Sequence, residues 1–292
     1  MKTAWVFPGQ GSQTVGMGGD LQTEPLAQKR FQQAEAILGW SVLDRCQGDE
    51  TELARTLYTQ PCLYVIECIL VDLLRDRGHQ PDLVAGHSLG EYVALYSAGV
   101  FDFATGLRLI QKRAALMDSS ANGAMAALIG ADRDQLEQVL ANTADVVLAN
   151  DNSAAQVVIS GTPTAVETVL GQVKAKRAVR LNVSGAFHSP LIADAAAEFA
   201  QVLEPIAFQP AQVPVLSNVE PQATTDAAVL KQRLAAQMTG QVRWREICLQ
   251  LPELGIEQAW EVGPGNVLTG LLKRTCKGLG LVNIGQLADL PS

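Results

Sequence analysis

The run Gly86-His87-Ser88-Leu89-Gly90 constrains the fold more than any other feature of the 292-residue chain. It follows the apolar residues Leu83-Val84-Ala85, and an apolar helical pattern begins directly after it at Glu91. A G-x-S-x-G run between a strand and a helix is typical of a nucleophile elbow, a tight turn that exposes the serine hydroxyl. The alternative is an ordinary glycine-containing loop. The flanking strand and helix favour the elbow, and Ser88 is the candidate nucleophile.

Elsewhere the chain alternates short apolar strands with helices, a pattern that indicates an α/β fold with a parallel sheet. Residues 4–7 predict a strand that ends at Pro8-Gly9, and Asp102 begins a helix with apolar steps of three and four residues. Further along, the sequence predicts a helix from Ser189-Pro190 to about 203, strands at 213–219 and 258–262, a turn at 263–265 and a helix at 267–274.

The pattern changes between residues 123 and 187, where the predicted order is βαββαβ. The predicted strands are 124–129, 146–150, 156–160 and 179–183; Asp132 begins the first helix, and Thr164 with Glu167 forms a capping box for the second. This order is that of a ferredoxin-like unit. We therefore expect a small ferredoxin-like subdomain at 123–187, inserted into a larger α/β subdomain made of 1–122 and 188–292.

Composition excludes several classes of function. The chain has 22 basic and 30 acidic residues, a net charge of −8, which disfavours nucleic-acid binding. The 5 cysteines include no Cys-x-x-Cys pair, so we expect no zinc or other metal site and a reducing, cytoplasmic location. No run of about 18 uncharged apolar residues predicts a membrane span, and the N-terminus lacks the pattern of a secretory signal.

A serine nucleophile needs a base, and the chain offers His79, His87 and His188. His87 is next to the serine on a tight turn, which favours a packing or hydrogen-bonding role. His79 lies in a polar connection. His188 directly precedes a predicted helix, whose dipole favours the neutral ring that a general base requires. A structural loop histidine is the alternative reading of His188, but it is the best candidate base for Ser88.

Other polar residues allow two interpretations each. Asp145 and Asp151 lie between serine and histidine in the chain, yet both fall in the inserted unit. Neither is therefore assigned as the acid that orients His188, and a backbone carbonyl is the alternative. Arg113 either shares a solvated helix face with Lys112 or forms a fork for a substrate carboxylate. The loop around Gln10 matches no phosphate-binding motif and follows the first strand, where open α/β sheets bind ligands.

Taken together, seven elements resemble the malonyl-CoA:acyl carrier protein transacylase family over nearly the whole chain. In chain order they are Phe7-Pro8-Gly9-Gln10-Gly11-Ser12-Gln13, Thr59-Gln60-Pro61, Gly86-His87-Ser88-Leu89-Gly90-Glu91-Tyr92, Arg113, Gly185-Ala186-Phe187-His188-Ser189, Ser217-Asn218-Val219 and Glu261-Val262-Gly263-Pro264-Gly265. The resemblance implies a large α/β-hydrolase-like subdomain with a ferredoxin-like insertion.

The resemblance also implies a role for individual residues. Ser88 would be the nucleophile and His188 its base, with the backbone N–H groups of Gln10 and Leu89 as the oxyanion hole. Arg113 would bind the malonyl carboxylate. The remaining implied positions are the carbonyl of Gln237, which orients His188; Phe187, which limits bulk at the α-carbon; and Gln60, Asn218 and 263–265, whose roles are structural.

The implied reaction moves a malonyl group from malonyl-CoA to the phosphopantetheine thiol of holo acyl carrier protein, supplying fatty acid or polyketide synthesis. No tightly bound cofactor is expected, and a monomer is preferred. Two alternatives remain open, a serine thioesterase or esterase and a non-catalytic carrier-protein scaffold. Because carrier proteins are acidic, docking is expected at basic clusters. These are Lys174, Lys176, Arg177 and Arg180 in the insert, and Lys273, Arg274 and Lys277 near the C-terminus.

Overall fold

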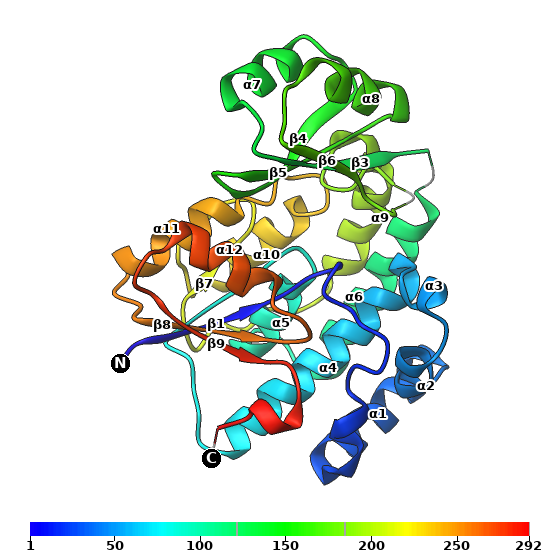
Figure 1. Cartoon of the computed structure of the whole chain (residues 1–292). Coiled ribbons are helices and arrows are strands. Elements are labelled where there is room, and N and C mark those ends of the chain that lie inside the picture. The colour runs from blue at the N-terminus through cyan, green and yellow to red at the C-terminus, as the bar shows by residue number, and fades with distance from the viewer. Residues whose placement is uncertain (121, 184, 292) are drawn as a thin grey trace.

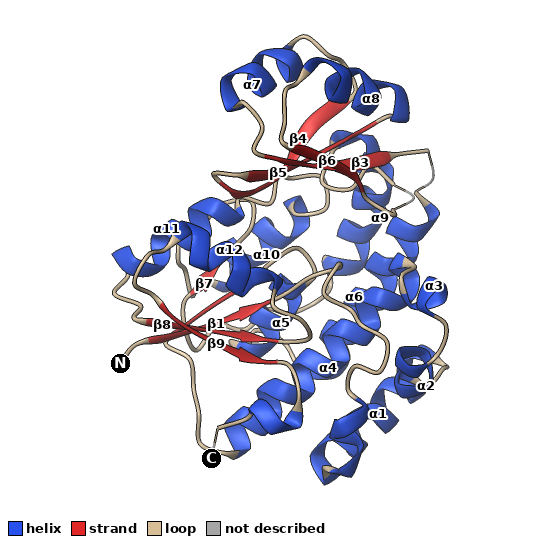
Figure 2. Cartoon of the chain, viewed as in Figure 1, coloured by secondary structure: helices blue, strands red, loops and turns tan. Residues whose placement is uncertain are grey.

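The computed structural model describes residues 1–120, 122–183 and 185–291, and two β-sheets organise these residues (Figures 1 and 2). The larger sheet has five parallel strands in the order β7-β2-β1-β8-β9. They are β1 (Thr3–Phe7), β2 (Leu83–Gly86), β7 (Val215–Leu216), β8 (Gln258–Val262) and β9 (Gly280–Ile284). The parallel order confirms the α/β class.

Helices cover both faces of this sheet because successive strand residues point to opposite sides. Trp5 and Phe7 on β1 belong to a core with the helices α1 (Pro25–Leu38), α2 (Val42–Gln47), α4 (Thr56–Asp76), α5 (Gly90–Ser97), α6 (Phe103–Ser119), α9 (Ala193–Leu203) and α10 (Ala227–Ala236). Ala4 and Val6 pack on α11 (Trp244–Glu253) and α12 (Val267–Thr275). The described chain also has α3 (Glu50–Leu53) and 3-10 helices at Gly19–Thr23, Pro190–Ile192 and Leu287–Asp289.

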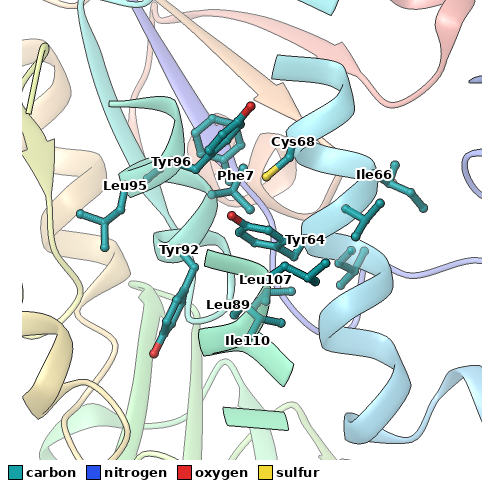
Figure 3. Packing of buried hydrophobic residues seen from close by; sticks show 14 of the residues in the cluster. Phe7, Tyr64, Ile66, Cys68, Leu89, Tyr92, Leu95, Tyr96, Leu107 and Ile110 are labelled. Atoms are coloured by element: carbon teal, nitrogen blue, oxygen red, sulfur yellow. The ribbon is translucent and has the colours of Figure 1, made fainter. Parts of the chain in front are cut away.

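The helix α4 contains Glu67 and Asp72, so it is not a run of uncharged apolar residues. By length and composition, with 21 residues, it is nevertheless long and apolar enough to cross a membrane. However, 83% of its most apolar window is buried within the protein. Figure 3 shows Tyr64 and Cys68 of α4 packed among side chains of α5, α6 and β1. The burial of α4 is therefore that of a core helix.

The smaller sheet is antiparallel, with strand order β4-β5-β3-β6. Its elements are β3 (Ala124–Ile129), α7 (Arg133–Ala141), β4 (Val146–Ser153), β5 (Gln156–Gly161), α8 (Pro163–Gln172) and β6 (Arg177–Arg180). This is the predicted βαββαβ order, and α7 and α8 cover the face of the sheet that lies away from the large sheet (Figure 1). Met125, Ala127 and Val158 on the other face pack into the main core.

Three predicted details are wrong at the level of single elements. The residue that caps α8 is Thr162, not Thr164, because Pro163 suits the first helical position; Glu167 instead pairs with Arg180. The strand expected at 213–219 is reduced to β7, since the chain beyond Leu216 turns toward the elbow. The last strand of the insert, predicted at 179–183, is β6 (Arg177–Arg180), and it ends three residues before the predicted end.

Candidate active site

The turn around Ser88 has the geometry of a nucleophile elbow, and it is held by the close approach of backbone to backbone. Ser88 has a left-handed φ of 52°, a conformation that costs a non-glycine residue free energy. A Cβ atom on Gly86 would lie 1.9 Å from the carbonyl carbon of Gly90, and one on Gly90 would lie 2.1 Å from the carbonyl oxygen of Phe7. Only glycine fits at either position, so the motif is required by the geometry of β1, β2 and α5.

Asn218 holds both sides of this turn. Its Oδ1 accepts a 2.7 Å hydrogen bond from the Ser88 N–H, and its Nδ2 donates to the carbonyl of Gly86 at 2.6 Å. The Ser88 N–H is therefore occupied. The resemblance gave Asn218 a structural role, and this pair of contacts accounts for it.

His188 lies within hydrogen-bond distance of the serine, with 2.8 Å between Nε2 and Ser88 Oγ. Its Nδ1 faces two backbone carbonyls, those of Gln237 at 3.0 Å and Gly240 at 3.1 Å. Because carbonyls only accept, Nδ1 carries the proton and Nε2 is left to accept from the serine hydroxyl. Asp151 is paired with Arg133, away from the ring. The geometry thus agrees with the expectation that the backbone carbonyl of Gln237 orients the His188 ring.

Burial keeps the His188 ring neutral. Burial and, to a lesser extent, the nearby positive charge of Arg113 lower the pKa of His188 to about 3. The expected cause was the dipole of a following helix, but the chain after Ser189 begins only with a three-residue 3-10 helix. Desolvation is the larger cause.

Arg113 is buried, with only 1% of its surface exposed, so the solvated-face interpretation is wrong. Its Nη1 donates to Gln60 Oε1 at 2.7 Å, and its Nη2 donates to Ser88 Oγ at 3.0 Å and to Gln237 Oε1 at 3.1 Å. Lys112, its neighbour in sequence, instead pairs with Glu198. A buried guanidinium against the serine hydroxyl provides a fixed positive charge where an acyl group would bind.

Beside Ser88 lies a cavity of about 80 Å³. It is lined by loops and helices around the large sheet and by residues of the segment 123–187. The predicted residues Gln10, Leu89 and Phe187 line it beside Ser88. Within the described chain, neither the Gln10 nor the Leu89 backbone N–H donates a hydrogen bond, and the Gln10 side chain contacts Thr56. These two N–H groups are therefore free to bind an oxyanion.

Sequence reasoning missed much of the apolar lining of this cavity. The missed residues are the apolar Met117, Met125, Leu181 and Val183 and the polar Asn150. Met117 was detectable, because it lies four residues after Arg113 and thus on the same face of α6. The other four come from the insert, and no local pattern points to them.

Two further predictions concern His87 and metals. His87 lies beside the site, with its ring against Trp244 and Nε2 2.8 Å from Asn152 Oδ1, as its expected packing role requires. Among residues 1–120, 122–183 and 185–291, no group of three His, Cys, Asp or Glu side chains is arranged to hold a metal ion.

Comparison with known proteins places the chain in a family. The acyl transferase domain family matches residues 4–287. A malonyl CoA-acyl carrier protein transacylase of Synechocystis sp. is 62% identical over 292 residues, covering 100% of both chains. The chain belongs to the malonyl-CoA:acyl carrier protein transacylase family. Another relative, a polyketide-biosynthesis transacylase of the same type from Bacillus subtilis, is 42% identical over 94% of this chain and 96% of its own.

Solved structures of the family have the same fold as this chain. The crystal structure of the Synechocystis transacylase superposes with a TM-score of 0.98 at 62% identity, covering 99% of each chain. A malonyl-transacylase in complex with its type II polyketide synthase acyl-carrier protein superposes with a TM-score of 0.94 at 38% identity, over 99% of this chain and 98% of that one. Together these matches confirm the family resemblance and the acyltransferase class.

Proposed function

We propose that the chain transfers a malonyl group from malonyl-CoA to the phosphopantetheine thiol of holo acyl carrier protein through a malonyl-serine ester. The observation that carries this proposal is the contact of Ser88 Oγ with both His188 Nε2 and the guanidinium of Arg113. A serine paired with a base could serve any acyl transfer, but a buried cation beside it favours an acyl group that ends in a carboxylate.

In the first half-reaction, Ser88 Oγ attacks the thioester carbon while His188 Nε2 takes the hydroxyl proton. The tetrahedral oxyanion is stabilised by the free N–H groups of Gln10 and Leu89. Collapse of this intermediate breaks the C–S bond, and the proton on His188 passes to the leaving CoA thiolate. The neutral ring of His188 is in the correct state to begin the cycle.

In the second half-reaction, the carrier-protein thiol attacks the malonyl-serine ester. His188 takes the thiol proton and returns it to Ser88 Oγ as the ester bond breaks, so the enzyme is regenerated. Arg113 holds the malonyl carboxylate through both halves, and Phe187 limits space at the α-carbon. The reaction needs no tightly bound cofactor, and malonyl-CoA is a substrate.

For the carrier protein, we propose docking at the two predicted basic clusters. The insert cluster keeps Lys174, Lys176 and Arg177 exposed, while its Arg180 is paired with Glu167. Near the C-terminus, Lys273, Arg274 and Lys277 are exposed. Charge reversal of either cluster is expected to raise KM for carrier protein and spare KM for malonyl-CoA; an unchanged carrier KM would remove that cluster from the docking site.

We further propose that the protein acts as a monomer in a reducing cytoplasm, and that 1–122 with 188–292 and the insert 123–187 are its two subdomains. The five cysteines are free and buried, which supports a reducing compartment. We propose that the malonyl-loaded carrier protein is used in fatty acid synthesis. Polyketide synthesis is the second candidate, because a transacylase of polyketide biosynthesis is similar to this chain.

Steady-state kinetics test the proposed reaction. Ping-pong transfer predicts parallel double-reciprocal lines when malonyl-CoA is varied at several concentrations of holo carrier protein. Malonyl-CoA hydrolysis without carrier protein should be much slower than transfer. Hydrolysis as fast as transfer would instead identify a thioesterase, and a stable complex without acyl exchange would identify a scaffold.

A further inference from the structure

The proposed mechanism does not use Glu91, a carboxylate buried in the first turn of α5. Glu91 is fully buried and lies three residues after Ser88. Burial raises its pKa, but hydrogen bonds from Gln237 and Asn218 oppose that rise by favouring the charged form. Burying a carboxylate costs free energy unless hydrogen bonds or a positive charge compensate for the loss of water. The groups that bond Glu91 here belong to the site.

Glu91 Oε2 accepts two hydrogen bonds from segments that contact the reacting groups. Gln237 Nε2 donates to it at 2.7 Å, and the Asn218 N–H donates at 3.2 Å. Asn218 holds the elbow, and Gln237 supplies the carbonyl that faces His188 Nδ1. One carboxylate oxygen therefore joins the two segments that position the serine and the histidine.

The orientation of the Gln237 side-chain amide follows from these contacts. A carboxylate only accepts hydrogen bonds, so the NH₂ group of Gln237 must face Glu91, and it also donates to the Ser88 carbonyl at 2.8 Å. The amide oxygen then faces the opposite way, where it accepts from Arg113 Nη2 at 3.1 Å. Glu91, Gln237 and Arg113 thus form a directed chain of hydrogen bonds, which we call the Glu91 relay.

We propose that Glu91 is a positioning residue that orients the guanidinium of Arg113 for the acyl carboxylate by fixing the Gln237 amide. If the amide rotated, its NH₂ group would face Arg113 Nη2, and two donors would meet in a buried site. The guanidinium would then keep only Gln60 and Ser88 as partners. This inference rests on the proposed role of Arg113 in binding malonyl.

Two substitutions at Glu91 separate hydrogen bonding from charge. Glu91→Gln can place its amide oxygen where Oε2 lies and keep both hydrogen bonds, with its NH₂ group toward the neighbouring Ser217 hydroxyl. Glu91→Met has similar volume but accepts no comparable hydrogen bond. A third variant, Gln237→Met, breaks the relay while leaving the backbone carbonyl that faces His188 unchanged.

The measurement is kcat/KM for carrier-protein acylation with malonyl-CoA and with acetyl-CoA, which has no carboxylate for Arg113 to bind. We expect Glu91→Met and Gln237→Met to lower the malonyl value by about tenfold or more and the acetyl value clearly less. Acetyl transfer shares only the loss of the contacts with Asn218 and with the Ser88 carbonyl. Glu91→Gln should stay within about threefold of the wild type for malonyl. If Glu91→Met does not fold, Gln237→Met carries the test.

Equal losses for malonyl and acetyl in both methionine variants would reduce Glu91 to a purely structural role and overturn the proposal. So would unchanged malonyl transfer, or a Glu91→Gln variant as impaired as Glu91→Met. Arg113→Ala is the reference: if it does not discriminate between the two acyl groups, the role of Arg113 itself is wrong and the proposed function must be revised first. A Glu91→Met/Gln237→Met double variant should lower the ratio of malonyl to acetyl transfer no further than either single variant, because both break one chain.

Discussion

Ser88 and His188 lie in two turns with nearly the same left-handed backbone, but the turns are held in different ways. Their φ values are 52° and 57°. Around Ser88, backbone atoms of β1, β2 and α5 approach so closely that Gly86 and Gly90 can carry no side chain. Around His188, the contacts are hydrogen bonds to a distant segment, in which Met238 accepts from the backbone N–H at 3.1 Å.

This difference separates a turn held mainly by close backbone packing from one held by hydrogen bonds. A non-glycine residue in this conformation costs about 1–3 kcal/mol, which the surrounding structure must offset. For Ser88 the offset comes from close backbone packing of β1, β2 and α5, together with the hydrogen bonds of Asn218. For His188 it comes from a segment 49 residues later, through Gln237. Substitutions in the two turns should therefore fail in different ways.

The largest effect is expected at the elbow. Gly90→Ala places a Cβ atom 2.1 Å from the Phe7 carbonyl oxygen, so the sheet or the turn must move. We expect a loss of at least about 3 kcal/mol in the free energy of unfolding, together with loss of activity. Gly171→Ala is the matched control, because a Cβ atom there meets nothing within 4 Å. Denaturant unfolding that gave equal stability for both variants would contradict the steric account of the elbow.

The second prediction concerns the histidine turn. His188→Ala removes the base but leaves the elbow intact, so the rate of serine acylation should fall about 10³-fold. The free energy of unfolding should fall by no more than about 2 kcal/mol. Stopped-flow acylation and denaturant unfolding measure the two quantities. If His188→Ala destabilised the fold as much as Gly90→Ala, the distinction between the two turns would fail.

Arg113 connects the two regions, since it donates to Ser88 Oγ and to Gln237 Oε1. Arg113→Ala should lower malonyl transfer by about 10²-fold, because the charged hydrogen bond to the carboxylate is lost, and lower acetyl transfer much less. Competition assays with both CoA thioesters measure the ratio directly. Equal losses for both acyl groups would refute the carboxylate role.

A further prediction is a pH dependence of stability due to His188. Its pKa is about 3 in the folded protein and ordinary in the unfolded chain, so the unfolded state binds more protons between about pH 3 and 6.5. Stability should therefore fall as the pH falls through that window, by up to about 1.4 kcal/mol per pH unit from this one group. His188→Gln should remove this part of the dependence of unfolding free energy on pH. If the free energy of unfolding changed equally with pH in the wild type and in His188→Gln, the burial of a neutral ring would be contradicted.

The elbow was predictable from sequence for a physical reason. Its strand, its serine and its two glycines lie within a few residues. Gly86 is limited by Gly90 within the turn itself, whereas Gly90 is limited by Phe7 on β1. The same holds for the caps at Asp102 and Asp132, whose side chains accept from nearby backbone N–H groups. Hydrogen bonds and steric contacts between neighbouring residues can be recognised from a short stretch of sequence.

The rest of the site could not be predicted this way. The burial of Arg113 depends on Gln60, Gln237 and Tyr92, which come from three other helices or their ends. The apolar lining from Met125, Leu181 and Val183 depends on how the insert packs over the large sheet. Glu91 was visible only as part of a motif, because its partners are more than 120 residues away in sequence.

Intact-protein mass spectrometry after brief exposure to malonyl-CoA tests the central claim most directly. The wild type should gain one malonyl adduct that disappears when holo carrier protein is added, while Ser88→Ala should gain none. The carrier protein should gain the same mass that the enzyme loses. An adduct of equal yield on Ser88→Ala, or one that discharges equally fast in buffer without carrier protein, would contradict acyl transfer through Ser88.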